Sequence, residues 1–179
     1  MNEGRGPVLL AIAREAIVAP AADWRTPSAR HPWLLEPGAT FVTLRSSGEL
    51  RGCIGSVEPR RPMGADVAAN AQAAALRDPR FPPVTRDEHA GLQVEVSVLS
   101  PREPLQAPTE SDALRLLRPG IDGVYLEFGQ ASATFLPQVW EGLADPREFL
   151  AQLRRKAGLA QGFWHADLRL SRYTVEKYA

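Results

Sequence analysis

Residues 50–56, Leu-Arg-Gly-Cys-Ile-Gly-Ser, bring a thiol, a guanidinium and two glycines together. If this segment is a strand, its side chains alternate between faces, so Arg51, Cys53 and Gly55 share one face and Gly52 lies on the other. A nearby positive charge favours the thiolate, the form of cysteine that attacks electrophiles and binds soft metals. Glycine within a strand is common where a ligand or another backbone comes close. The segment therefore predicts an activated Cys53 beside Arg51, with Gly55 leaving room above the sulfur.

A structural role explains the same residues. Free cysteine is among the most buried residue types, so Cys53 would then be a small core residue. Gly52 would be a packing point for the Ala-rich helix expected after Pro62. Both interpretations stay open from the residues alone.

Two further groups of residues suit acid–base chemistry or anion binding. Glu95, on the less apolar face of the strand expected at 92–99, would supply an acid or base together with Asp78 or Asp87, although a solvated sheet face explains it equally well. Arg80 has the fork of donors that binds a carboxylate or phosphate through two hydrogen bonds. Arg86 lies on the other side of the same Pro-rich segment.

Metal and cofactor chemistry is not indicated. His31, His89 and His165 lie in turn-like or loop-like positions, and Cys53 is the only cysteine, so their spacing matches no usual metal site. The phosphate-loop, dinucleotide-binding, metalloprotease and serine-hydrolase signatures do not occur. We expect no metal and no cofactor.

The helices and strands around these residues are predicted from hydrophobic periodicity and from the positions of turn residues. Pro7 suits the first position of an amphipathic helix that ends near Val18, and the Pro-rich stretch 19–39 is either a lid or a packed crossover. Asp145 followed by Pro146 is a strong helix start. The remaining expected elements are a hairpin of 41–45 and 50–57 around Gly48, a helix from Pro62 to Asp78, a strand at 92–99, a short helix at 111–117, a hairpin of 124–128 and 133–136, and a closing strand at 168–175. Hairpins with separate helices predict an α+β fold with an antiparallel or mixed sheet.

Composition limits the class of protein. The 179 residues include 44% hydrophobic residues, which suits one ordinary domain, and the 21 basic residues balance 21 acidic ones. A balanced charge does not favour nucleic acid or an anionic membrane as a partner. No apolar stretch approaches the roughly 20 residues that span a bilayer, and the N-terminus lacks the shape of a signal peptide. With a lone thiol, these features predict a cytoplasmic protein.

The ordered motifs of the chain resemble those of the AmmeMemoRadiSam system protein A family, named for its AMME-syndrome region. These motifs are Leu-Arg-Gly-Cys-Ile-Gly at 50–55, Asp-Pro-Arg-Phe-Pro-Pro at 78–83, Val-Glu-Val-Ser-Val-Leu at 94–99, Gly-Ile-Asp-Gly at 120–123, Phe-Leu-Pro-Gln-Val at 135–139 and Lys-Ala-Gly-Leu at 156–159. The resemblance covers roughly residues 8 to 178, leaving residues 1–7 as an N-terminal tail. It implies an α+β fold with a larger and a smaller subdomain intertwined in one domain.

The resemblance also implies a site and partners, but no settled reaction. The residues carried over as a site are Arg51, Gly52, Cys53, Gly55, Gln138, Arg80 and Glu95. The implied partners are a Memo-like protein and a radical S-adenosylmethionine (SAM) protein. The chain is therefore expected to be an enzyme component with Cys53, Arg51 and Glu95 at a small-molecule site, or else a non-catalytic module that presents the same surface to those partners.

Overall fold

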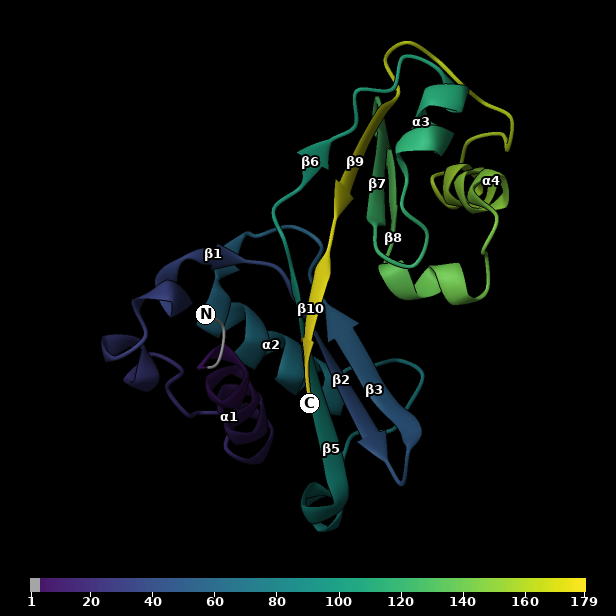
Figure 1. Ribbon diagram of the computed structural model, residues 1–179. Helices are drawn as coiled ribbons and strands as arrows, with labels where there is room; N and C mark the ends of the chain where they lie inside the picture. Colours follow the sequence, from purple (N-terminus) through teal and green to yellow (C-terminus); the bar gives the residue numbers. More distant parts are fainter. Residues whose placement is uncertain (1–3) are drawn as a thin grey trace. The chain divides into compact units, whose positions relative to one another are not determined.

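A computed structural model describes residues 4–179, which form two compact units (Figure 1). The larger unit contains the chain up to Leu99 together with Glu176–Ala179, and the smaller contains Ser100–Val175. Helices and antiparallel strand pairs occur in both units, which confirms the α+β fold. That the two units fold together as one domain over residues 8–178 stays a prediction.

The first unit is a four-stranded sheet with two helices. Its strands follow the order β10-β5-β2-β3, which makes β3 an edge strand, and a separate short pair joins β1 to β4. Its elements are α1 (Arg5–Val18), η1 (Thr26–Ala29), η2 (Pro32–Leu35), β1 (Pro37–Gly38), β2 (Thr40–Ser46), β3 (Glu49–Gly55), β4 (Arg61–Pro62), α2 (Met63–Leu76), η3 (Arg86–Gly91), β5 (Leu92–Leu99) and β10 (Val175–Tyr178).

The second unit has its own four-stranded sheet, with strand order β6-β9-β7-β8. Helices α3 and α4 lie on the same side of this sheet (Figure 1). Its elements are β6 (Glu103–Pro104), α3 (Glu110–Leu116), β7 (Gly123–Phe128), β8 (Ala131–Phe135), η4 (Pro137–Glu141), α4 (Pro146–Lys156) and β9 (Arg169–Tyr173).

The β2–β3 hairpin positions Cys53. Ser47 and Gly48 form its two-residue turn, with φ of 49° and 84°. Two successive positive φ values suit the right-handed twist of the flanking strands, and Gly48 adopts such a value without a steric cost. The predicted hairpin around Gly48 is thereby confirmed.

Helices α1 and α2 cover one face of the first sheet and form its core. The alternation predicted for 92–99 is confirmed, because Val94 and Val96 are buried while Gln93 is exposed. Fully buried members of this core include Leu9, Leu34, Val42, Leu44, Val67 and Val96. The opposite face, which carries Thr43, Cys53 and Glu95 and is called the polar face below, is only partly buried.

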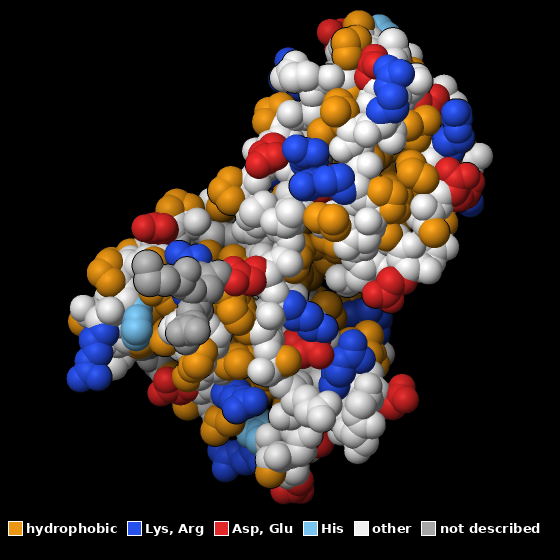
Figure 2. Space-filling view, viewed as in Figure 1, with side chains coloured by type: hydrophobic (Ala, Val, Ile, Leu, Met, Phe, Trp, Pro, Cys, Tyr) orange, Lys and Arg blue, Asp and Glu red, His pale blue; other side chains and the backbone are white. Residues whose placement is uncertain are grey.

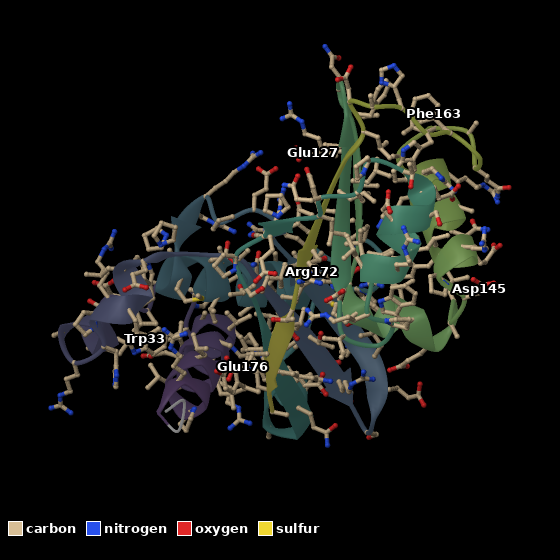
Figure 3. All side chains as sticks on the ribbon, turned by 45° about the horizontal axis from the view of Figure 1, so that its top comes forward. Trp33, Glu127, Asp145, Phe163, Arg172 and Glu176 are labelled. Atoms are coloured by element: carbon tan, nitrogen blue, oxygen red, sulfur yellow. The ribbon has the colours of Figure 1, made fainter. Side chains whose placement is uncertain are left out.

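The N-terminal part differs in detail from the sequence-based expectation. Helix α1 begins at Arg5, before Pro7, so the predicted tail 1–7 contributes to the helix, and residues 1–3 of it lie outside the described residues. The stretch 19–39 is packed by its own tryptophans. A Cβ on Gly64 would lie 2.5 Å from the Trp24 ring, and the Arg5 guanidinium lies 4.9 Å from the Trp33 ring, which Figure 3 labels.

The second unit shows the predicted helix start. Asp145 accepts a hydrogen bond from the Arg147 backbone N–H at 2.8 Å, as an N-cap does, and α4 follows it (Figure 3). Trp140 stacks on Phe149 at 3.7 Å between ring centroids and donates its indole N–H to the Asp122 carbonyl. Trp140 therefore belongs to the core of the second unit.

The closing segment is two strands rather than the single strand predicted at 168–175. β9 joins the second sheet and β10 joins the first, with Thr174 between them. Alternation alone does not reveal a change of sheet, because both strands share the same periodicity. None of the helices within residues 4–179 has the length and apolar character needed to cross a membrane.

Candidate functional site

A thiol, a hydroxyl and a carboxylate form a row across three strands of the polar face. In the antiparallel register Thr43 of β2 lies opposite Cys53 of β3 on one side and Glu95 of β5 on the other. The Cys53 Sγ lies 3.3 Å from the Thr43 Oγ1, within hydrogen-bonding distance for sulfur. Cys53 is partly exposed, so it is not the fully buried core cysteine of the structural interpretation.

Glu95 occupies the far end of this row between two cations. Its carboxylate lies 2.8 Å from the Lys177 Nζ and 3.4 Å from the Arg45 Nε, and its side chain is only 17% exposed. Lys177 comes from β10, at the far end of the chain. Its part in the site follows from the pairing of β10 with β5 and could not be read from local sequence.

The backbone of Cys53 is held at the sheet edge by an ion pair. Its N–H donates to Asp78 Oδ2 at 2.9 Å, and its carbonyl accepts from the Arg80 guanidinium at 3.2 Å. Asp78 and Arg80 bind each other through two contacts, of 2.7 and 3.0 Å. The two side chains therefore bind the backbone N–H and carbonyl of Cys53, which a further strand would otherwise bind at this sheet edge.

The charges of this pair reinforce each other. The Arg80 hydrogen bond is the main reason that the pKa of Asp78 lies well below its ordinary range, although burial works in the opposite direction. The same bond is the main reason that the pKa of Arg80 is raised, and the neighbouring Cys53 side chain makes a smaller contribution in the same direction. Arg80 is therefore a fixed positive charge near the sulfur.

Arg51 makes different contacts from those expected. Its guanidinium binds both carboxylate oxygens of Glu88, at 2.7 and 3.1 Å, and donates to the Pro82 carbonyl at 2.9 Å. The Arg51 bond, followed by hydrogen bonds from Thr85, lowers the pKa of Glu88 to about 2. These contacts fasten the segment 78–88 to β3, and a catalytic role for Arg51 stays a prediction.

The two glycines of the motif are close-packing positions. A Cβ on Gly52 would lie 2.2 Å from the Ala74 carbonyl oxygen of α2, which gives Gly52 the helix-packing role considered for it. A Cβ on Gly55 would lie 2.2 Å from the Phe41 ring. The ring therefore occupies the space that was expected to stay open beside Gly55.

A buried polar network lies beside the motif, and no sequence motif predicted it. Asp66 of α2 is 1% exposed and accepts hydrogen bonds from the Thr40 N–H and hydroxyl, the Ser56 hydroxyl and the Arg61 guanidinium. Asn70, one turn later, donates to the Thr40 carbonyl and to Asp66. The network could have been predicted from Asp66 and Asn70, because two polar residues four positions apart lie on one face of an Ala-rich helix.

Other predicted site residues are not gathered at Cys53. Gln138 lies in η4 of the second unit, so its place at the site stays a prediction. His31 lies near Trp33, His89 lies in η3, and His165 lies against Phe128 in the second unit. Within residues 4–179 no three His, Cys, Asp or Glu side chains are close enough together to hold a metal ion.

Together these features define a class of protein: an α+β protein with a partly exposed thiol on the polar face of one sheet, at an edge fastened by an Asp–Arg pair. A sequence profile of the AMMECR1 family matches residues 10–178, and the chain belongs to that family. The family includes AmmeMemoRadiSam system protein A, so the resemblance seen in the motifs is confirmed.

Relatives of similar length support this assignment. A protein of Methanothermobacter thermautotrophicus is 38% identical over 98% of this chain and 94% of its own length. A protein of Thermococcus gammatolerans is 40% identical over 96% of this chain and 88% of its own. The crystal structure of an uncharacterised protein from Pyrococcus horikoshii, 37% identical, matches with a TM-score of 0.81 over 96% of this chain and 89% of that one.

Proposed function

We propose that the chain is an enzyme component that binds a small molecule on the polar face of the first sheet and uses Cys53 as its reacting group. The observation that carries the proposal is the row of Cys53, Thr43 and Glu95, in which a partly exposed thiol contacts a hydroxyl at 3.3 Å. A nucleophile is activated by neighbours that favour its charged form, and the hydroxyl of Thr43 is such a neighbour for the Cys53 thiol. Such a small-molecule site agrees with the balanced charge of the chain.

The chemistry would proceed through the thiolate. Cys53 gives up its proton, its sulfur electron pair forms a bond to an electrophilic carbon, and a leaving group departs with the electron pair of the broken bond. Thr43 donates a hydrogen bond to the thiolate. The Cys53 proton passes to solvent water, since Cys53 is partly exposed, and Glu95 at the other end of the row is the proposed acid or base towards the bound molecule.

The proposed partners are a Memo-like protein and a radical SAM protein. Support for them comes from membership of the family alone. Acidic and basic side chains are interspersed on the surface drawn in Figure 2, so the partner surfaces would need mixed charges as well.

The second candidate function is a non-catalytic module that presents the motif to these partners. The packing of the motif favours the non-catalytic part of this candidate, because Gly52 contacts α2, Arg51 is bound by Glu88, and the Phe41 ring fills the space beside Gly55. Folding alone explains these residues, without any ligand.

The experiment that tests the first function is a comparison of Thr43→Val with the native chain. Valine keeps the shape and the β-propensity but removes the hydroxyl bound to Sγ. The rate of Cys53 alkylation at one fixed pH, measured by intact mass spectrometry, should fall by about fivefold or more, since a hydrogen bond to a charged group contributes more than ~1 kcal/mol. Ser97→Ala, on the same face of β5, is the matched control.

Equal rates for Thr43→Val and Ser97→Ala would remove the chemical basis of the enzyme proposal. Purification from the native cell with the native chain and with Cys53→Ser then addresses the second candidate. The binding module would be favoured if the two alkylation rates are equal and if the native chain and Cys53→Ser both recover the Memo-like and radical SAM proteins.

A further inference from the structure

The ion pair at Cys53 is unequally exposed. The Asp78 side chain is 1% exposed, whereas that of Arg80 is 53% exposed. The carboxylate is therefore hidden behind the guanidinium, and it is the positive partner that faces solvent beside the motif.

The Arg80 guanidinium has donors beyond those that hold it in place. Its contacts with Asp78 and with the Cys53 carbonyl use Nε and both N–H groups of Nη2, which are three of the five donors of a guanidinium. Nη1 supplies the other two, and the Cys53 thiol is a further hydrogen-bonding neighbour of the guanidinium. The Phe81 ring, 5.5 Å from the guanidinium carbon, supports its orientation further.

Other cations on this side of the first unit are engaged differently. Arg51 is 13% exposed and binds Glu88 through two hydrogen bonds, and Arg45 and Lys177 both contact Glu95. Arg80 combines a rigid hold on the backbone of Cys53 with a solvent-facing positive charge. Such a pre-organised guanidinium binds a carboxylate or phosphate at a low entropic cost.

We propose that Arg80 is the anion-binding group of the site, so that the small molecule meeting Cys53 carries a carboxylate or phosphate next to its electrophilic carbon. This inference rests on the proposed function, because it names the substrate class of the same site. Asp78 is a positioning residue that holds Arg80 against the edge of β3.

Two alkylating reagents of nearly equal size test the proposal. Iodoacetate carries a carboxylate and iodoacetamide does not, while both react in the same way: the Cys53 thiolate forms an S–C bond, the C–I bond breaks, and iodide leaves with its electron pair. The quantity to measure is the ratio of the iodoacetate rate to the iodoacetamide rate at Cys53, divided by the same ratio for N-acetylcysteine.

For the native chain this normalised ratio should exceed one at low salt, by up to about fivefold. That limit is the factor for unit charges ~4 Å apart in water, and the paired Asp78 carboxylate offsets part of the Arg80 charge. The ratio should fall as salt is added. Arg80→Gln should bring the ratio to one or below, because the Asp78 carboxylate beside Cys53 loses its partner, and Arg80→Lys should keep most of the native ratio. Arg25→Gln is the matched control, because Arg25 also pairs with an aspartate two residues earlier, Asp23, and lies in the segment between α1 and β1, away from β3 in Figure 1.

The outcomes separate this inference from the proposed function. If Cys53 of the folded chain reacts with neither reagent, the proposed function itself fails. If Cys53 reacts with both but the native ratio is one at low salt, or is unchanged in Arg80→Gln, only the anion-binding role is refuted. If Arg80→Gln does not fold, the proposal is still tested by the native ratio, by its salt dependence and by Arg80→Lys. A native ratio of one overturns the proposal without any variant.

Discussion

Replacement of Gly52 by alanine tests how the motif strand packs on α2. The new Cβ would lie 2.2 Å from the Ala74 carbonyl oxygen, whereas ordinary van der Waals contact begins at 3.4 Å, so β3 and α2 must separate by more than about 1 Å. Overpacking costs ~1–3 kcal/mol, and because the obstacle is backbone rather than a flexible side chain, we expect the upper end, ~3 kcal/mol. For a chain of this size that corresponds to a fall in melting temperature of roughly 6–12 °C.

Thermal and urea denaturation of Gly52→Ala, followed by circular dichroism, measure this change. Gly91→Ala is the matched control, because no atom lies within 4 Å of its Cβ position, and it should stay within about 0.5 kcal/mol of the native chain. Gly55→Ala should fall between the two, since the Phe41 ring can rotate away. A Gly52→Ala chain as stable as Gly91→Ala would refute the close contact between β3 and α2.

Three further predictions concern the polar contacts. Asp66→Ala should lower the free energy of unfolding by ~3 kcal/mol or more, because it leaves buried donors without an acceptor, whereas Asp23→Ala, which breaks an exposed pair, should change it by less than ~1 kcal/mol in the same urea titration. Asp145→Ala should destabilise the chain by about 0.5–2 kcal/mol, the usual cost of losing an N-cap, and an unchanged denaturation midpoint would argue against that cap. Because Arg51 lowers the pKa of Glu88 from 4.5 to about 2, the stability that Glu88 contributes is present above pH 4.5 and is lost as the pH falls towards 2, so Glu88→Gln should show a smaller decline over this window in acid titrations followed by circular dichroism.

Local patterns predicted much of the fold. Alternation along 50–56 correctly put Cys53 on one face of its strand and Gly52 on the other, because side-chain direction in a strand depends only on parity. The turn at Gly48 and the cap at Asp145 were equally local, since each depends on the backbone preferences of a few consecutive residues.

Contacts between distant residues could not be predicted in this way. The β2–β3 register shifts between Leu44 and Arg45, which leaves Arg51 without a partner on β2. Glu88, 37 positions later, binds its guanidinium, and only the path of the chain brings Glu88 there. Strand pairing places Thr43 beside Cys53 and brings Lys177 to Glu95. Such pairing depends on register and sheet order rather than on local sequence. Alternation likewise predicted open space beside Gly55, which the Phe41 ring of the neighbouring strand fills. The direction of that ring depends on packing between strands and not on local sequence.

The measurement that tests the central claim most directly is the labelling of Cys53 in the folded chain. Iodoacetamide is added with and without denaturant, the adduct is counted by intact mass spectrometry, and Cys53→Ser serves as the blank because Cys53 is the only cysteine. If the thiol on the polar face is the reacting group, the native chain gains one adduct while its melting curve shows that it is still folded. Labelling that occurs only after unfolding would contradict the account and leave Cys53 as a structural residue.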